Sequence, residues 1–168
     1  MNRTRAAVCV VGAALALTGC FRYSFTGSRP LPGVETIQID QFVNLAPLVN
    51  PNVANDLSEQ VRNTFLRQSN LKLVTREGDV VVTGQIVRYE VTPRNITAGE
   101  VAALNEFRIT VKVKYENTLF PDLGWTQEFT QFETFAQEQD FTAAENALLP
   151  TLLERVSLDI FNKILGDW

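Results

Sequence analysis

The residues best suited to ligand chemistry alternate along one predicted strand, residues 106–117. Phe107 and its alternate neighbours are apolar, so the opposite face carries the polar side chains, which are Arg108, Thr110, Lys112, Lys114 and Glu116. On such a strand Lys112 and Lys114 would stand about 7 Å apart. Their ammonium groups could meet phosphates as point charges. The alternative is the ordinary solvated face of an antiparallel strand.

Two arginines could enlarge this basic face. Arg88 lies on the preceding predicted strand, residues 79–91, and Arg94 lies just beyond its end. The alternation of that strand slips near Gly84, where a glycine favours a bulge. We therefore expect Arg88 and Arg94 to join the basic face only if the slip turns them toward it.

Catalytic chemistry has little support in the residue types. The chain has no histidine, which excludes Ser-His-Asp triads and histidine-ligated zinc. Nothing fixes the separation of the acids Glu133, Glu138 and Asp140, whereas glycosidases need carboxylates at about 5 Å or more. A phosphate-cradling glycine loop and a nucleophile elbow are both missing from the sequence. We predict a non-enzyme with no cofactor, metal or small-molecule substrate, and its net charge of −4 argues against nucleic acid.

The N-terminus has the pattern of a secretory signal. Arg3 and Arg5 precede an uncharged run over residues 6–17 that is too short to span a bilayer. The run ends in Leu17-Thr18-Gly19-Cys20, which resembles the lipobox of bacterial lipoproteins. We therefore expect residues 1–19 to be removed and Cys20 to carry diacylglycerol and acyl chains such as palmitate. An ordinary signal with an incidental Cys20 is the alternative.

Lipidation at Cys20 would have clear consequences for the mature chain, residues 20–168. No thiol would remain, because Cys9 leaves with the signal. More than one acyl chain gives stable anchoring without a transmembrane segment. Phe21 stands where an Asp would mark inner-membrane retention in some lipoproteins, so we expect the periplasmic face of the outer membrane in a two-membrane bacterium.

Two amphipathic helices are predicted. Residues 53–68 follow Pro51 and place Val53, Leu57, Val61 and Phe65 on one stripe. Residues 143–165 form a longer helix with a leucine- and isoleucine-rich stripe. Asp140 or Thr142 could be its N-cap, with Glu145 completing a capping box.

Strands are predicted over residues 34–40, 71–75, 79–91, 106–117 and 125–137. In the last, Phe129, Phe132 and Phe135 break period two, which suggests a bulge or a bend. Core packing explains most of these aromatics and Trp125, and a partner-facing patch is the alternative. Residues 21–27 alternate aromatic and polar types, as in an edge strand or a tether on the membrane. The pattern predicts one α+β domain, a two-layer sandwich with both helices on one face of a mainly antiparallel sheet of about four strands.

The mature chain resembles the LptE-type lipopolysaccharide-assembly lipoproteins, in the form found in Bacteroidetes-like bacteria. The resemblance lies in the order and spacing of short motifs, which are Tyr23-Ser24-Phe25-Thr26-Gly27, Thr36-Ile37-Gln38-Ile39, Gly78-Asp79-Val80-Val81-Val82-Thr83-Gly84 and Asp159-Ile160-Phe161-Asn162-Lys163. It implies a non-catalytic outer-membrane lipoprotein that plugs the LptD β-barrel and contacts lipopolysaccharide. Lys112, Lys114, Arg108, Arg88 and Arg94 are then candidate partners of lipid A phosphates.

Three other functions fit the same sequence. Another outer-membrane accessory, such as a secretion-channel pilot protein or a curli-like component, would share the anchor and the α+β body. A periplasmic enzyme acting on envelope glycans would need converging acids in a cleft. A structural lipoprotein would have no ligand.

Overall fold

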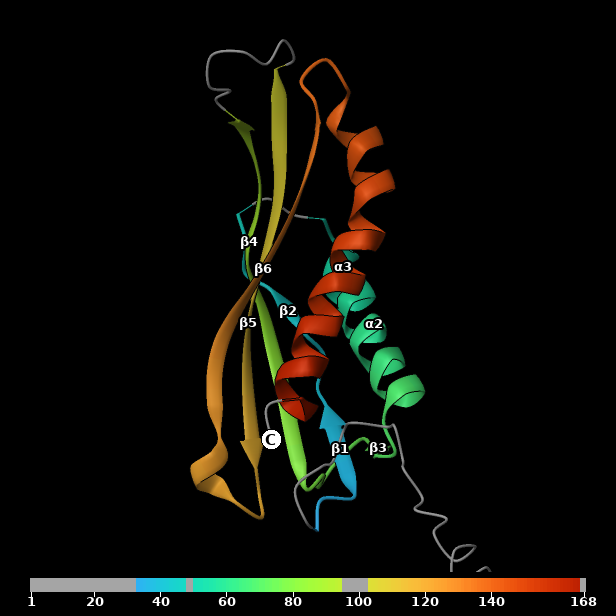
Figure 1. The fold of residues 1–168 in the computed structure, drawn as a ribbon, viewed down its shortest axis with the longest axis vertical. Coiled ribbons are helices and arrows are strands. Elements are labelled where there is room, and N and C mark those ends of the chain that lie inside the picture. Colours follow the sequence, from blue (N-terminus) through green and yellow to red (C-terminus); the bar gives the residue numbers. More distant parts are fainter. Residues whose placement is uncertain (1–32, 48–49, 95–102, 167–168) are drawn as a thin grey trace, which may run out of the picture.

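The structure is a computed structural model that describes residues 33–47, 50–94 and 103–166 (Figure 1). The signal segment, Cys20 and the aromatic segment 21–27 lie outside these residues. The elements are, in chain order, β1 (Thr36–Ile39), β2 (Val43–Asn44), α2 (Val53–Gln68), β3 (Lys72–Val74), β4 (Val80–Arg94), β5 (Leu104–Asn117), the 3₁₀ helix η1 (Pro121–Leu123), β6 (Trp125–Ala136) and α3 (Phe141–Leu165).

The sheet has six strands and is mixed, which corrects the prediction of about four mainly antiparallel strands. Its order is β3-β1-β4-β5-β6, with β2 also paired to β4. The β4–β5 and β5–β6 pairs are antiparallel, but β1 is parallel to β3 and β4, and β2 is parallel to β4. Helix α2 connects β1 to β3 as a crossover, which makes a parallel pair possible. The two-residue β2 is too short to show any periodicity in the sequence.

The segment between β3 and β4 crosses β1, because β3 and β4 lie on opposite sides of that strand. Gly78 makes the crossing possible, since a Cβ there would lie 2.7 Å from the backbone nitrogen of Gln38. The carboxylate of Asp79 then accepts hydrogen bonds from the backbone nitrogens of Glu35 and Thr36 at 2.9 and 2.8 Å. These bonds hold the start of β1 against the start of β4.

The phase slip of β4 is real, but it lies after Gly84. The register with β5 shifts between Ile86 and Arg88, so Val87 is the extra residue. Because of this bulge, Tyr89 returns to the face that carries Val82 and Ile86, and all three side chains are buried. Gly84 has a different role, since the ring of Phe42 occupies the space that its side chain would fill.

Strand β6 has no bulge, which corrects that part of the prediction. Its register with β5 is continuous from Trp125 to Ala136. Phe129 and Phe135 are buried on the helix-covered face, as core packing requires, whereas Phe132 is 43% exposed. The three phenylalanines broke period two because Phe132 belongs to the opposite face of the sheet.

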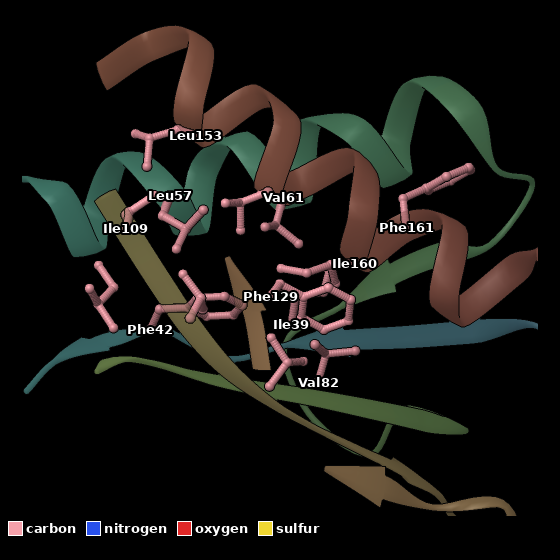
Figure 2. Packing of buried hydrophobic residues seen from close by; sticks show 14 of the residues in the cluster. Ile39, Phe42, Leu57, Val61, Val82, Ile109, Phe129, Leu153, Ile160 and Phe161 are labelled. Carbon is pink, nitrogen blue, oxygen red and sulfur yellow. The ribbon is translucent and has the colours of Figure 1, made fainter. Parts of the chain in front are cut away.

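Both helices pack on one face of the sheet, as predicted (Figure 1). The stripe Val53, Leu57, Val61 and Phe65 of α2 is buried, and α3 contributes Leu149, Leu152, Leu153, Val156, Ile160 and Ile164. Figure 2 shows Leu57, Val61 and Ile160 between the helices and the sheet residues Ile39 and Val82. The hydroxyls of Thr64 and Ser157 lie 3.1 Å apart in the buried α2–α3 interface.

Helix α3 begins at Phe141, two residues before the predicted start. Asp140 is its N-cap and accepts a hydrogen bond from the backbone nitrogen of Ala143 at 3.1 Å. Glu145 does not form the predicted capping box. Its carboxylate instead accepts hydrogen bonds from the hydroxyl of Tyr89 and from the amide of Asn50.

Candidate functional site

All five candidate basic residues lie on the face of the sheet opposite the helices, which we call the outer sheet face. Cross-strand partners share a face, and β4 and β5 pair Gln85 with Lys112 and Thr83 with Lys114. Beyond the bulge the pairs are Arg88 with Thr110 and Arg94 with Leu104. The extra residue at Val87 is therefore what turns Arg88 and Arg94 toward the side that carries Arg108, Lys112 and Lys114.

One half of the outer sheet face has an exposed aromatic ring that two guanidinium groups approach. Arg94 and Arg108 each place their central guanidinium carbon 5.8 Å from the ring centre of Phe132. Glu106 forms an ion pair with Arg108 and is itself buried. The arrangement presents flat cationic groups on a hydrophobic support, a geometry that suits phosphate or carboxylate groups.

Phe132 was not among the site residues predicted from the sequence. Its spacing was the available signal: Phe132 is three residues from both Phe129 and Phe135, and in a regular strand an odd spacing places a side chain on the opposite face. A phenylalanine in that phase must either bend the strand or face outward.

The other half of the outer sheet face is a shallow depression around the two lysines. It has a volume of about 280 Å³ and is lined by Thr83, Gln85, Lys112, Lys114 and Thr126. Lys114 pairs with Glu116 at 2.8 Å, whereas Lys112 forms no ion pair with any residue that the structure describes. Lys112 is thus the more available cation of the two.

Acidic side chains alternate with the basic ones across the outer sheet face. Cross-strand pairing puts Glu90 beside Arg108 and Glu128 beside Lys112. The face is therefore not a uniformly positive surface. An anionic ligand could bind a basic side chain here either by replacing the neighbouring carboxylate or by sharing the cation with it.

An apolar groove borders this face along the edge of β4 beyond β2. It has a volume of about 640 Å³ and is lined by Pro47, Val87, Arg88, Tyr89, Glu90, Val91 and Phe141. Tyr89 and Phe141 both pack edge-on against Phe107, with ring centres 5.0 and 5.3 Å away. Because Arg88 lines the groove and also belongs to the outer sheet face, the groove places apolar surface next to a cation.

A partly buried polar contact involves Tyr89, which also lines the groove. The Tyr89 hydroxyl donates to Glu145, which also accepts from the Asn50 amide at 2.6 Å. Burial, followed by the contact with Glu145, raises the pKa of Tyr89. Tyr89 is therefore a neutral hydrogen-bond donor at physiological pH.

The three acids considered for catalysis do not form a pair. Glu133 pairs with Arg155 of α3 at 2.5 Å, and Asp140 caps α3. Glu138 lies in the turn before that helix. Over residues 33–47, 50–94 and 103–166, no helix is long and apolar enough to cross a membrane.

Comparison with known proteins gives one family and several related folds. The family LptE, described as lipopolysaccharide-assembly, matches residues 34–164. No curated protein sequence matches the chain. A minor lipoprotein from Acinetobacter baumannii is 13% identical with a TM-score of 0.50, and the alignment covers 78% of this chain and 92% of that one.

Two further solved structures share the fold at low sequence identity. A protein from Xanthomonas campestris is 16% identical with a TM-score of 0.55, covering 79% of this chain and 86% of that one. A hypothetical protein from Chlamydia trachomatis is 9% identical with a TM-score of 0.51, covering 80% and 99%. These likenesses concern the fold alone. The family match begins two residues before β1 and ends at the penultimate residue of α3. The chain therefore belongs to the LptE family of lipopolysaccharide-assembly proteins.

Proposed function

We propose that this protein is a lipid-anchored lipoprotein on the periplasmic face of the outer membrane, where it partners an LptD-like β-barrel and contacts lipopolysaccharide. The match to the LptE family over residues 34–164 carries this proposal. The lipobox pattern at Leu17-Thr18-Gly19-Cys20 supports the anchor, with lipid on the Cys20 sulfur and amino group.

The outer sheet face supports the contacts. Large β-barrels have polar interiors, and this face offers a polar surface of matching character. Lipid A combines phosphates with acyl chains, and the face combines five basic residues with an adjoining apolar groove. We assign the phosphates to the region of Arg88, Arg94 and Arg108 and to Lys112 and Lys114. The groove beside Arg88 would take apolar parts of the same ligand.

The partner is tested by purifying the protein from native membranes with a tag at its C-terminus. Co-purification of a large β-barrel, with loss of folded barrel and surface lipopolysaccharide after depletion, is expected. Recovery of a secretin ring or a curli-type pore instead, with normal lipopolysaccharide after depletion, would assign the chain to another assembly system. Mass spectrometry of the same sample measures the lipid on Cys20.

The ligand contact is tested by charge reversal. K112E/K114E should weaken capture of purified lipopolysaccharide about tenfold or more, because two attractive charges become repulsive. R67E/R76E is the matched control, since both residues are exposed but belong to α2 and the turn after β3. Equal capture by both double variants would remove Lys112 and Lys114 from the proposal.

A further inference from the structure

The turn between β5 and β6 exposes a compact group of apolar side chains. Leu119, Phe120 and Leu123 are 47%, 41% and 37% exposed. They are three of seven large hydrophobic side chains that are exposed in the described part of the chain, and they lie within five consecutive residues. We call Leu119, Phe120 and Leu123 the hairpin tip. Grouped exposed apolar residues commonly mark an interaction site, whereas isolated ones do not.

Polar contacts hold the hairpin tip in this conformation. The side-chain oxygen of buried Asn117 accepts hydrogen bonds from the backbone nitrogens of Leu119 and Phe120 at 2.9 and 2.8 Å. Within η1, the backbone nitrogen of Leu123 donates to the carbonyl oxygen of Phe120 at 3.0 Å. The backbone is thus fixed by its own hydrogen bonds, and the apolar side chains remain outside the core.

The hairpin tip lies where the described chain begins. A Cβ on Gly33 would lie 3.8 Å from Leu119 Cδ1. Asp79 links the two segments, because its carboxylate binds the backbone of Glu35 and its carbonyl oxygen accepts from the Thr118 hydroxyl at 2.6 Å. The turn between β5 and β6 and the start of β1 also lie at the same end of the sheet in Figure 1.

The length of the preceding chain limits the distance from the hairpin tip to Cys20. Twelve residues separate Cys20 from Gly33. Even fully extended they reach only about 45 Å. A lipid on Cys20 would therefore keep the start of the described chain, and the hairpin tip beside it, within roughly 45 Å of the leaflet surface, so the tip can reach the leaflet.

We propose that the hairpin tip inserts into the interfacial layer of the leaflet that holds the Cys20 lipid, as a second membrane contact. This inference rests on the anchoring part of the proposed function. A specific protein interface buries about 800 Å² on each partner, more than three half-exposed side chains on a narrow turn provide. Insertion into a lipid interface needs only apolar side chains that leave water.

The charges of the turn specify the kind of membrane contact. Asp122 is the one charged residue between Thr118 and Gly124, and no cation accompanies it. Attraction to anionic headgroups requires clustered lysines or arginines. The contact should thus be apolar, equal on zwitterionic and anionic vesicles, and little affected by salt.

Depth-dependent quenching on the lipidated mature protein tests this directly. With Cys20 occupied by lipid, F120C provides the single thiol for an environment-sensitive fluorophore. In vesicles of phosphatidylethanolamine and phosphatidylglycerol, we expect a blue-shifted emission that brominated acyl chains quench. A label at L45C is the matched control, because Leu45 is 61% exposed but lies just after β2. Water-like emission from F120C, or burial only after an LptD-like barrel is added, would overturn the inference.

A second measurement separates this inference from the anchor. The full mature chain with C20S is sedimented with vesicles of the same composition and with phosphatidylcholine vesicles. L119S/L123S should lower its partitioning about tenfold, whereas L45S should leave it unchanged. Loss of partitioning in L119S/L123S supports tip insertion even if native Cys20 proves to carry no lipid. A lipidated Cys20 with equal partitioning of all variants would reject the tip and leave the proposed function intact.

Discussion

The ring of Phe42 fills the space above Gly84, where the side chain of any other residue would stand. An added Cβ would lie within 2.6 Å of three ring carbons. Phe42 lies in the break between β1 and β2, and its backbone nitrogen donates to the Ser58 hydroxyl of α2 at 2.9 Å. This contact fixes the point where the edge of β4 changes its partner from β1 to β2.

Substitution of Gly84 should therefore destabilise the fold. G84A forces the buried Phe42 ring to move in a close-packed core, and we expect a loss of about 1–3 kcal/mol in the free energy of unfolding. Chemical denaturation measures it. F42L in the same chain should recover part of the loss, because the smaller side chain frees the space. A double variant as unstable as the sum of the two single variants would contradict the contact.

A second prediction concerns the carboxylate of Asp79. The backbone N–H of Glu35, then the hydroxyl and the backbone N–H of Thr36, hold its pKa below the ordinary value of 3.8. A carboxyl group with a lowered pKa in the folded state stabilises the fold above its unfolded pKa, and the stabilisation is lost as pH falls through the folded pKa. We expect D79A to cost about 1–2 kcal/mol at neutral pH. Denaturation curves should show that the difference between D79A and the native chain shrinks below about pH 3.8. An unchanged difference at acidic pH would exclude the carboxylate as the cause.

The contact between Tyr89 and Glu145 leads to a third prediction. It ties the middle of β4 to the first turns of α3, and the Asn50 amide shares the same carboxylate oxygen. Y89F should cost about 1 kcal/mol, because Glu145 keeps one of its two donors. E145A should cost more, since it leaves the buried Tyr89 hydroxyl and the Asn50 amide without this acceptor. A double-mutant cycle measures the coupling, and a coupling energy near zero would contradict the hydrogen bond.

The parts of the fold that could be predicted are those with local periodicity. Helix α2 has the predicted bounds, because Val53, Leu57, Val61 and Phe65 recur at steps of four. The five basic residues of the outer sheet face follow from strand alternation once the bulge is counted. The sequence could not locate that bulge. It shows only that the alternation changes phase between Val82 and Tyr89. The bulge was predicted near Gly84 because glycine favours bulges, but Gly84 is needed instead for the close contact with Phe42.

Features that depend on distant segments could not be predicted. The parallel pairing of β1 with β4 follows from the α2 crossover and from the chain crossing at Gly78, neither of which leaves a periodic signal. The apolar groove exists because β2 ends at Asn44 while β4 continues to Arg94. Its lining joins Pro47, Val91 and Phe141, which are far apart in the sequence.

The last prediction tests Phe132 as a support for two arginines. F132L keeps an apolar side chain but removes the aromatic face below Arg94 and Arg108, and cation–π contacts at exposed sites contribute about 0.5–1 kcal/mol. We expect stability to change by less than about 1 kcal/mol, because Phe132 lies outside the core. Titration with purified lipopolysaccharide should show capture weakened about two- to fivefold, since the guanidinium groups lose their fixed orientation. L66A, which shortens another exposed apolar side chain, on α2, is the control and should bind normally. Normal capture by F132L together with weak capture by K112E/K114E would place the phosphate contact at the lysines alone.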